Sequence, residues 1–439
     1  MKKILTLAAF LILVLASISY GTATTYYVNS ATGSDANTAL QAQSASTPWA
    51  TIGHAISNVS PGDIINVESG TYAENITINK SLTLQGSGAA TTTISATGGT
   101  AVTITADEVG IDGFTITNPT GKNGIYAQNH SDIVITNNII TDIGSSDVSG
   151  SGTNYGIGIA STSADVNNII IDGNNVNHII GGNFKSANGI VVGFSTGNNL
   201  ITSVFIQNNT ISYIRSSILA YGSGGRGAYG ILLNHSGNVT GQTVAPQIVG
   251  NTITDLEGLW SHGIGLEGNT PNALVKDNTI DGLVDYKSPG DPDGAAITFE
   301  DNPSANTVTV IQNKFSNVYV GVRNATALTV DVRGNLWEDN DPSDNIYNTS
   351  SGSVLYAPWL GRDYTNDSHS SGWLWYTDAS SSITDAIDLT QFLSGDSLSV
   401  VAGTTYDSFS VVGKSDLTIF GAGVGSTVIN PTATSAVNR

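Results

Sequence analysis

Seven short segments share one pattern: an apolar run that ends in Asn and is followed at once by a second run typical of a β-strand. They are ITNNII (135–140), IDGNNV (171–176), IQNNTI (206–211), IVGNTI (248–253), VKDNTI (275–280), VIQNKF (310–315) and VRGNLW (332–337). The shared residues are Asn138, Asn174, Asn209, Asn251, Asn278, Asn313 and Asn335, which lie 22 to 42 residues apart. Recurrence at this interval is the signature of a repeat architecture.

A second element, rich in Gly, recurs between these segments. Its copies are NGIYAQN (123–129), YGIGIAS (155–161), NGIVVGF (188–194), YGILLNH (229–235), HGIGLEG (262–268), GAAITFED (294–301) and VGVRNA (320–325). Each repeat thus offers three strands with alternating apolar residues, too short and too often broken by Gly and Asn for helices. Stacked coils bury one face of each such strand. The sequence therefore predicts an all-β fold, a parallel β-helix or β-solenoid.

The repeated Asn is interpreted as structural. Asn tolerates the left-handed conformation of a turn, and its side-chain amide can bond to the same residue in the next coil. The extra length of the longer repeats falls in one place, before the Gly-led strand. We expect these insertions to stack along one side of the rod, at 144–155, 181–188, 215–229, 257–262 and 284–294.

Both ends of the repeat region carry related segments. PWATIGHAI (48–56) predicts a short amphipathic helix that caps the first coil, as a solenoid requires. The same order of elements returns between residues 383 and 421. We therefore expect a β-helix over 24–360, a linker over 361–381 and the start of a second, truncated β-helix over 382–439.

The composition excludes several classes of protein. Only 11% of the 439 residues are Asp, Glu, Lys or Arg, whereas about 25% is usual for a globular domain. The formal net charge of -20 repels a phosphate backbone and argues against a nucleic-acid partner. The chain has no Cys, which removes disulfides and thiolate metal sites.

The N-terminus has the pattern of a secretory signal. Lys2 and Lys3 precede an apolar run over 4–18, and small residues follow up to Ala23. The run is shorter than the roughly 20 residues that span a bilayer. We expect residues 1–23 to be removed, leaving a secreted or cell-surface protein with no membrane insertion.

Beyond the repeats, several stretches carry a family resemblance. TTYYVNSATGSDAN (24–37), the cap at 48–56, GDIINVESGTYAENITI (62–78) and LTLQGSG (82–88) resemble the secreted right-handed parallel β-helix proteins of the pectate-lyase-like superfamily. GNLWEDNDPSDN (334–345) is similar to a closing segment of such proteins. The resemblance implies a right-handed coil and an extracellular polysaccharide as partner. It assigns no activity, since the superfamily includes lyases, hydrolases, epimerases, esterases, tailspikes and non-catalytic surface proteins.

The catalytic motifs of that superfamily are largely missing. Asp291-Pro292-Asp293-Gly294 matches the epimerase motif only in part, because it lacks the His. Ser261-His262-Gly263 is similar to one element of the polygalacturonase set. Basic residues, which the lyases of this superfamily need, are scarce.

One group of charged residues emerges when the Gly-led strands are aligned. With Ile125, Ile157, Ile190, Ile231, Ile264, Ile297 and Val320 in register, one outward row reads Gln128, Ala160, Gly193, Asn234, Glu267, Glu300 and Arg323. Neighbouring strands lie about 4.8 Å apart. We therefore expect Glu267 beside Glu300, with Arg323 one coil further on, as the candidate catalytic residues.

Two carboxylates at that separation leave three interpretations open. One is a Ca²⁺ or substrate site, with Glu267, Glu300, Asp301 and Asp293 as ligands, because Ca²⁺ prefers hard oxygen donors. Another is acid–base chemistry, because carboxyl groups about 5 to 5.5 Å apart fit a retaining glycosidase. The third is a surface row in which Arg323 neutralises Glu300.

Further polar and aromatic residues flank this row. The candidate substrate-binding residues are Trp260, His262, His235, Tyr229, Tyr286 and Arg226. Aromatic rings offer flat apolar faces that suit the C–H faces of sugars. The predicted function is binding of extracellular polysaccharide along the loop-bearing side, with cleavage or modification as an open extension. The alternative is a non-catalytic surface or adhesion protein, and either would be a monomeric rod.

Overall fold

The computed structural model describes most of the chain, and every structural statement below concerns that part. The described residues are 22–146, 152–182, 185–193, 199, 201–216, 226–235, 244–286, 294–337, 342–357, 359–360, 374–377, 396–400, 403–406, 417–421 and 427–429. The predicted signal at 1–23 therefore lies almost wholly outside the described residues.

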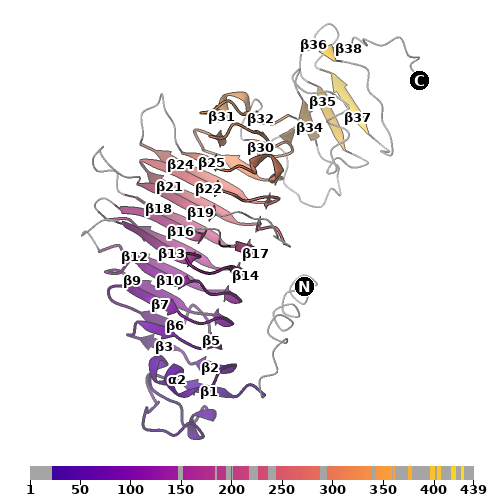
Figure 1. Ribbon diagram of the computed structural model, residues 1–439. Helices are drawn as coiled ribbons and strands as arrows, with labels where there is room; N and C mark the ends of the chain where they lie inside the picture. The colour runs from indigo at the N-terminus through magenta and orange to yellow at the C-terminus, as the bar shows by residue number, and fades with distance from the viewer. Residues whose placement is uncertain are drawn as a thin grey trace.

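The chain winds as a parallel β-helix of three-stranded coils (Figure 1). Each coil places one strand in a first sheet, the next in a third sheet and the next in a second sheet before the path repeats. The first and second sheets have ten strands each, and the third has fourteen. The all-β, parallel β-helix prediction is confirmed.

The strand bounds follow the coils. The first sheet holds β1 (Thr25–Val28), β2 (Asp63–Val67), β5 (Leu82–Gly86), β8 (Val109–Asp112), β11 (Ile133–Thr136), β14 (Val166–Asp172), β17 (Ile201–Gln207), β20 (Gln247–Val249), β23 (Leu274–Lys276) and β26 (Thr309–Ile311). The second holds β4 (Ile76–Ile78), β7 (Thr100–Ile104), β10 (Asn123–Gln128), β13 (Gly152–Ala160), β16 (Lys185–Gly193), β19 (Gly227–His235), β22 (Trp260–Gly268), β25 (Ala295–Glu300), β28 (Val322–Asn324) and β31 (Ile346–Asn348). The third begins with β3 (Gly70–Tyr72), β6 (Thr92–Ser95), β9 (Thr115–Asn118), β12 (Ile139–Ile143), β15 (Asn175–Ile180), β18 (Thr210–Arg215), β21 (Thr252–Gly258), β24 (Thr279–Asp285), β27 (Lys314–Ser316) and β30 (Leu336–Trp337).

Four more strands complete the third sheet. They are β33 (Trp359–Leu360), β34 (Leu374–Thr377), β35 (Ser397–Val400) and β37 (Thr418–Gly421), and β33 pairs antiparallel with β34. Two parallel pairs stand apart: β29 (Thr329–Asp331) with β32 (Ser353–Leu355), and β36 (Gly403–Tyr406) with β38 (Thr427–Ile429). The division at 360 and the second β-helix stay predictions.

The Asn ladder forms as predicted. All seven side chains are buried, and the backbone N and side-chain Nδ2 of each of the first six donate to Oδ1 of the ladder Asn in the next coil. For Asn209, the backbone N and the side-chain Nδ2 both donate to Oδ1 of Asn251, at 2.9 and 3.0 Å. The left-handed residue is the one before the ladder Asn, such as Asn208 (φ 53°) or Gly250 (φ 69°), rather than the Asn itself. The turn and the ladder thus use two adjacent positions.

The N-terminal cap also forms. The helix α2 (Ile52–Asn58) buries Ile52 and Ile56, and Oγ1 of its N-cap residue Thr51 accepts from the backbone N of His54. Trp49 is buried and stacks on Tyr26, with ring centroids 5.2 Å apart. This packing closes the open end of the first coil.

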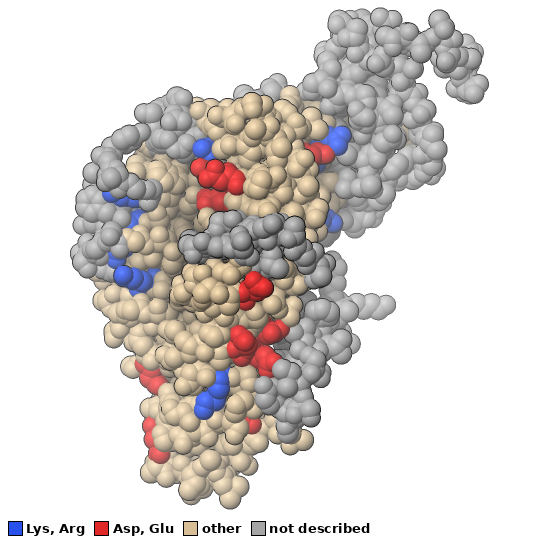
Figure 2. Space-filling model, in the orientation of Figure 1, with Lys and Arg blue, Asp and Glu red and all other residues tan. Residues whose placement is uncertain are grey.

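Parts of three predicted insertions belong to strands. Residues 152–155, 185–188 and 227–229 extend the strands β13, β16 and β19 of the second sheet. Within the described residues, no helix is long and apolar enough to cross a membrane. On the face shown in Figure 2, charged side chains are scattered over a surface made mostly of other residues.

Candidate functional site

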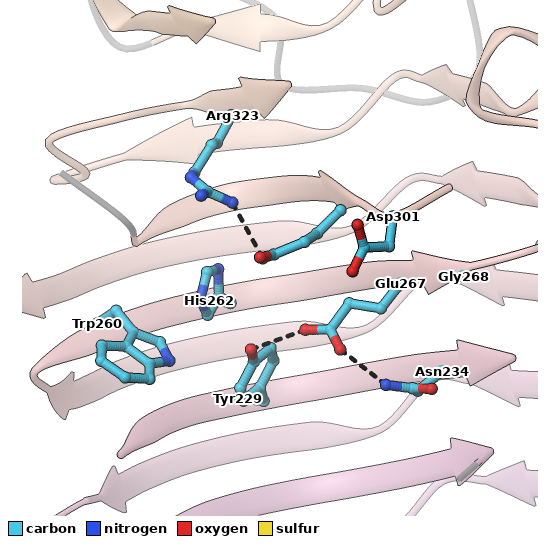
Figure 3. A pocket seen from close by; sticks show the side chains of 9 residues that line it. Tyr229, Asn234, Trp260, His262, Glu267, Gly268, Asp301 and Arg323 are labelled. Atoms are coloured by element: carbon cyan, nitrogen blue, oxygen red, sulfur yellow. Dashed lines mark hydrogen bonds and ion pairs between the residues drawn. The ribbon is translucent and has the colours of Figure 1, made fainter. Parts of the chain in front are cut away.

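A polar pocket of about 510 Å³ lies over four neighbouring strands of the second sheet (Figure 3). The strands β19, β22, β25 and β28 are consecutive in that sheet, so they bring together residues that are almost a hundred positions apart. The lining residues are Tyr229, Asn234, Trp260, His262, Glu267, Gly268, Glu300, Asp301 and Arg323. The pocket therefore contains the charged row that the sequence alignment predicts.

Glu267 is fixed on both carboxyl oxygens. Tyr229 donates its hydroxyl to Oε1 at 2.7 Å, and the Asn234 side chain donates to Oε2 at 2.8 Å. Burial raises the pKa of Glu267, the hydrogen bond from Tyr229 works against that rise, and the negative charges of Glu300 and Asp301 add to it. This carboxyl group is thus held in place where a negative charge is unfavourable.

Glu300 lies beside Glu267, as predicted. The two residues are direct partners across β22 and β25. The Oε2 atom of Glu300 accepts from Nη1 of Arg323 at 3.0 Å. The pocket thus sets one carboxyl with a raised pKa next to one that is paired with a guanidinium group.

The predicted register of Arg323 is wrong by two residues. Ile297 pairs with Val322 and not with Val320, so Arg323 stands opposite Thr298 rather than Glu300. A shift of two residues keeps a side chain on the same face of a strand. The long side chain of Arg323 therefore still reaches Glu300, on a diagonal. The other six residues of the aligned row are in the predicted register.

His262 forms the buried floor of the pocket. Its ring stacks on that of Tyr229, with centroids 4.5 Å apart, and its Nδ1 lies 2.7 Å from Oγ1 of Thr298. Burial lowers the pKa of His262 to about 3, with a further contribution from the positive charge of Arg323. The imidazole is therefore neutral at physiological pH and acts as a polar wall.

Trp260 borders the pocket at the start of β22. It is partly exposed, and it is the register partner of Gly227 in β19. A Cβ atom at Gly227 would lie only 2.3 Å from Nε1 of Trp260. Gly227 thus leaves room for the indole ring of Trp260.

Two other predicted residues, Tyr286 and Arg226, are not among the described residues that line the pocket. Tyr286 is 50% exposed and donates its hydroxyl to Glu257, whereas Arg226 is buried and its carbonyl accepts from Ser216. His235 ends β19, with its side chain outside the described part of the structure. Asp293 is outside the described residues altogether.

The predicted Ca²⁺ site gains no support from the described residues. Among them, no group of three or more His, Cys, Asp or Glu side chains is arranged to hold a metal ion. Both oxygens of Glu267 already accept hydrogen bonds, and Oε2 of Glu300 faces a guanidinium group. Calcium binding through Glu267, Glu300, Asp301 and Asp293 stays a prediction, and no step below depends on it.

Two residues of the site were missed by sequence reasoning. Asn234 belongs to the aligned outward row, and that alignment already predicted that it lies beside Glu267. Thr298 carries no signal of that kind, because a Thr inside a strand is ordinary. Its contact with His262 also joins residues that are out of register, since the register partner of His262 is Ala295.

The arrangement suits ligands with hydroxyl groups. Carboxylate oxygens accept hydrogen bonds from hydroxyls, and the Trp260 ring offers an apolar face. A carboxyl with raised pKa beside one that is paired with a guanidinium group also has the form of an acid and base pair. The fold and this pocket define the class as a parallel β-helix protein with a polar pocket on one sheet.

Comparisons with known proteins give a local match in sequence and several matches in backbone. No family model matches the chain. Over 79 residues it is 47% identical to a cell surface glycoprotein of Methanothermus fervidus, a match that covers 18% of this chain and 13% of that protein. The chain thus spans about an eighth of the length of that relative.

Several solved structures are similar in backbone. They include a pectin methylesterase from carrot (TM-score 0.37, 11% identity, 78% of this chain and 91% of that one) and an alginate lyase from Paenibacillus sp. (0.35, 15%, 69% and 96%). A GH136 lacto-N-biosidase from Eubacterium ramulus has a TM-score of 0.38 at 12% identity, over 76% of this chain and 68% of that one. Likeness at this level concerns the fold alone.

Proposed function

We propose that this protein is exported and binds extracellular polysaccharide in the pocket over β19, β22, β25 and β28. The volume of about 510 Å³ falls within the roughly 300–1,000 Å³ of small-molecule sites. A sugar ring would lie against the indole of Trp260, and its hydroxyl groups would donate to Glu267 and Glu300.

The observation that carries the proposal is the fixed carboxyl of Glu267 at the centre of a pocket bordered by Trp260. Tyr229 and Asn234 hold both oxygens of Glu267, so little side-chain entropy is lost when a ligand binds. A row of surface charges that binds no ligand has no need for a carboxyl group whose two oxygens are both held by hydrogen bonds. This argument favours binding over the purely electrostatic interpretation.

Retention on immobilised glycans tests the proposal. The mature chain is run through affinity gels that contain pectate, alginate or neutral glycans, beside the double variant Trp260→Ala, Glu267→Ala. We expect at least one glycan to retard the wild type and the variant to lose that retardation. Equal mobility of the two proteins in every gel would refute binding in this pocket.

Chemistry on the bound glycan is a second part of the proposal. Glu267 would protonate the glycosidic oxygen as its bond to C1 breaks, while Glu300, held by Arg323, would form an ester to C1. A water molecule that gives a proton back to Glu267 would then hydrolyse this ester and release Glu300. Assays of reducing ends and of unsaturated-product absorbance, each with and without Ca²⁺, test for hydrolysis and elimination. Release of reducing ends that is lost in Glu267→Gln supports hydrolysis, and absence of turnover on every glycan opposes it.

A second candidate function is that of a non-catalytic surface protein. The observation that favours it is the 47% identity over 79 residues to a protein named cell surface glycoprotein. Under this alternative the β-helix presents its loops and the pocket only adheres to a glycan. Fractionation of the native host distinguishes the two: a protein that stays with the cell surface and turns over no glycan fits the second candidate.

A further inference from the structure

The charges of the pocket carry information on which sugars fit it. Among the residues that the structure describes, the lining contains three carboxyl groups, those of Glu267, Glu300 and Asp301, and one basic side chain, that of Arg323. The guanidinium group of Arg323 faces Oε2 of Glu300, and its side chain is only 9% exposed. The cation is thus largely engaged inside the protein.

The other nitrogen-containing side chains of the described lining add no positive charge. His262 is buried, and burial with the nearby Arg323 lowers its pKa to about 3. The Trp260 indole and the Asn234 amide are neutral donors. Among the described lining residues, therefore, no cation besides Arg323 would offset the repulsion between a ligand carboxylate and the carboxyl groups of Glu267 and Asp301.

A negative charge is already unfavourable at this place. Besides burial, the charges of Glu300 and Asp301 raise the pKa of Glu267 itself. A ligand carboxylate at the same depth would experience the same two charges. Like charges that are brought together in an interface cost several kcal/mol and exclude a partner.

We infer that the pocket takes a sugar without a carboxylate, either uncharged or bearing an amino group, and rejects uronates. The inference rests on the proposed function and names the class of glycan. Sugar hydroxyls would donate to the carboxyl oxygens, and the C–H face would pack on Trp260. An ammonium group would be attracted by the excess of negative charge.

The test compares matched ligands. Wild-type protein is titrated with oligogalacturonate and oligoguluronate, with the same oligomers after their carboxyl groups are reduced to alcohols, and with neutral and chitosan oligomers. We expect the ligands that bind to be neutral or to bear amino groups. Each carboxylate oligomer should bind about tenfold more weakly than the same oligomer after reduction. One molar salt should narrow this difference, because the Debye length falls to about 3 Å.

A charge variant sharpens the test. Asp301→Asn removes one negative charge and keeps a residue that tolerates the left-handed backbone at this position (φ 47°). We expect the ratio of reduced to carboxylate affinity to fall about threefold, from the loss of one solvent-screened charge. The matched control is Asp132→Asn, another Asp with positive φ (57°) outside the pocket lining, which should leave the ratio unchanged.

The outcomes separate the two claims. Uronates that bind as tightly as their reduced forms would overturn the inferred glycan class and leave polysaccharide binding intact. If Asp301→Asn and Asp132→Asn change the ratio of reduced to carboxylate affinity equally, the charge of the pocket does not select the glycan. If no glycan of any class binds, the proposed function fails and the inference fails with it.

Discussion

The inner corner of the coils and the outer face of the second sheet follow opposite rules. At the corner, seven coils place the same residue, from Asn138 to Asn335, and every copy is buried. On the outer face, the aligned row changes from Gln128 and Ala160 to Glu267 and Glu300. The repeated position stabilises the stack, and the varied one provides a local chemistry.

The difference has a physical cause. A ladder amide both donates and accepts, so identical neighbours satisfy one another, as Asn251 and Asn278 do at 2.9 Å. A carboxylate only accepts, so Glu267 beside Glu300 carries an electrostatic cost. Residues that cost stability at a fixed place in a fold are candidates for function.

The largest expected effect is at the ladder. Asn251→Ala leaves the backbone N and the Nδ2 of Asn209 without their buried acceptor, and leaves the carbonyl of Ile206 without its donor. We expect the free energy of unfolding to fall by about 3 to 5 kcal/mol, since each unsatisfied buried group costs about 1–3 kcal/mol. Urea unfolding followed by circular dichroism measures this loss.

The control for that variant is the next residue. Thr252 is exposed at the start of β21, and its replacement by Ala should change the free energy of unfolding by less than about 1 kcal/mol. A ladder variant that loses no more stability than Thr252→Ala would show that the ladder contributes little.

A smaller effect follows from the buried imidazole of the pocket. The folded pKa of His262, about 3, lies below its ordinary value of 6.5, so the unfolded chain takes up a proton first as pH falls. Stability from the neutral His262 is complete above pH 6.5 and is lost between there and pH 3. From pH 6.5 to pH 5 the loss is about 2 kcal/mol, at about 1.4 kcal/mol for each pH unit.

The measurement compares wild type with His262→Gln, a neutral side chain that cannot titrate. Urea unfolding at pH 6.5 and pH 5 should show the wild type losing about 2 kcal/mol more than the variant. Parallel losses in the two proteins would mean that His262 is protonated in the folded state.

The smallest expected effect has the opposite sign. Glu267→Gln removes a carboxylate from a place where burial and the charges of Glu300 and Asp301 raise its pKa. At pH 8 the variant should be more stable by about 1 kcal/mol, the common gain when a functional group is neutralised. A raised folded pKa means that this gain shrinks as pH falls through it, because the wild-type carboxyl then becomes neutral. Thermal unfolding at pH 8 and pH 5 checks both signs, and a destabilised variant at pH 8 would contradict the account.

The repeated features of the fold could be predicted from the sequence. The ladder Asn recurs in seven coils and the buried Ile row from Ile125 to Ile297 in six, and recurrence reveals register. Val320 was aligned wrongly because Val320 and Val322 are both apolar and two residues apart. An alternating pattern is unchanged by a shift of two, so only the structure distinguishes them.

The pocket could be predicted only in part. Glu267, Glu300 and Arg323 were found from the aligned row, although the diagonal reach of Arg323 was not. The bond from Tyr229 to Glu267 crosses strands at different positions along them, which a register alone does not show. Tyr286 and Arg226 were expected in the site because they lie in the insertions, but the Tyr286 hydroxyl donates to Glu257, and the backbone carbonyl of Arg226 accepts from Ser216.

One measurement tests the central claim, that the varied outer row forms a binding site and the ladder does not. Calorimetric titration gives the dissociation constant of the best-retained glycan for Glu267→Gln and for wild type, under conditions where circular dichroism shows both folded. We predict that the variant binds about tenfold more weakly, a loss of about 1.4 kcal/mol, although it is the more stable protein at pH 8. An unchanged dissociation constant would contradict the account.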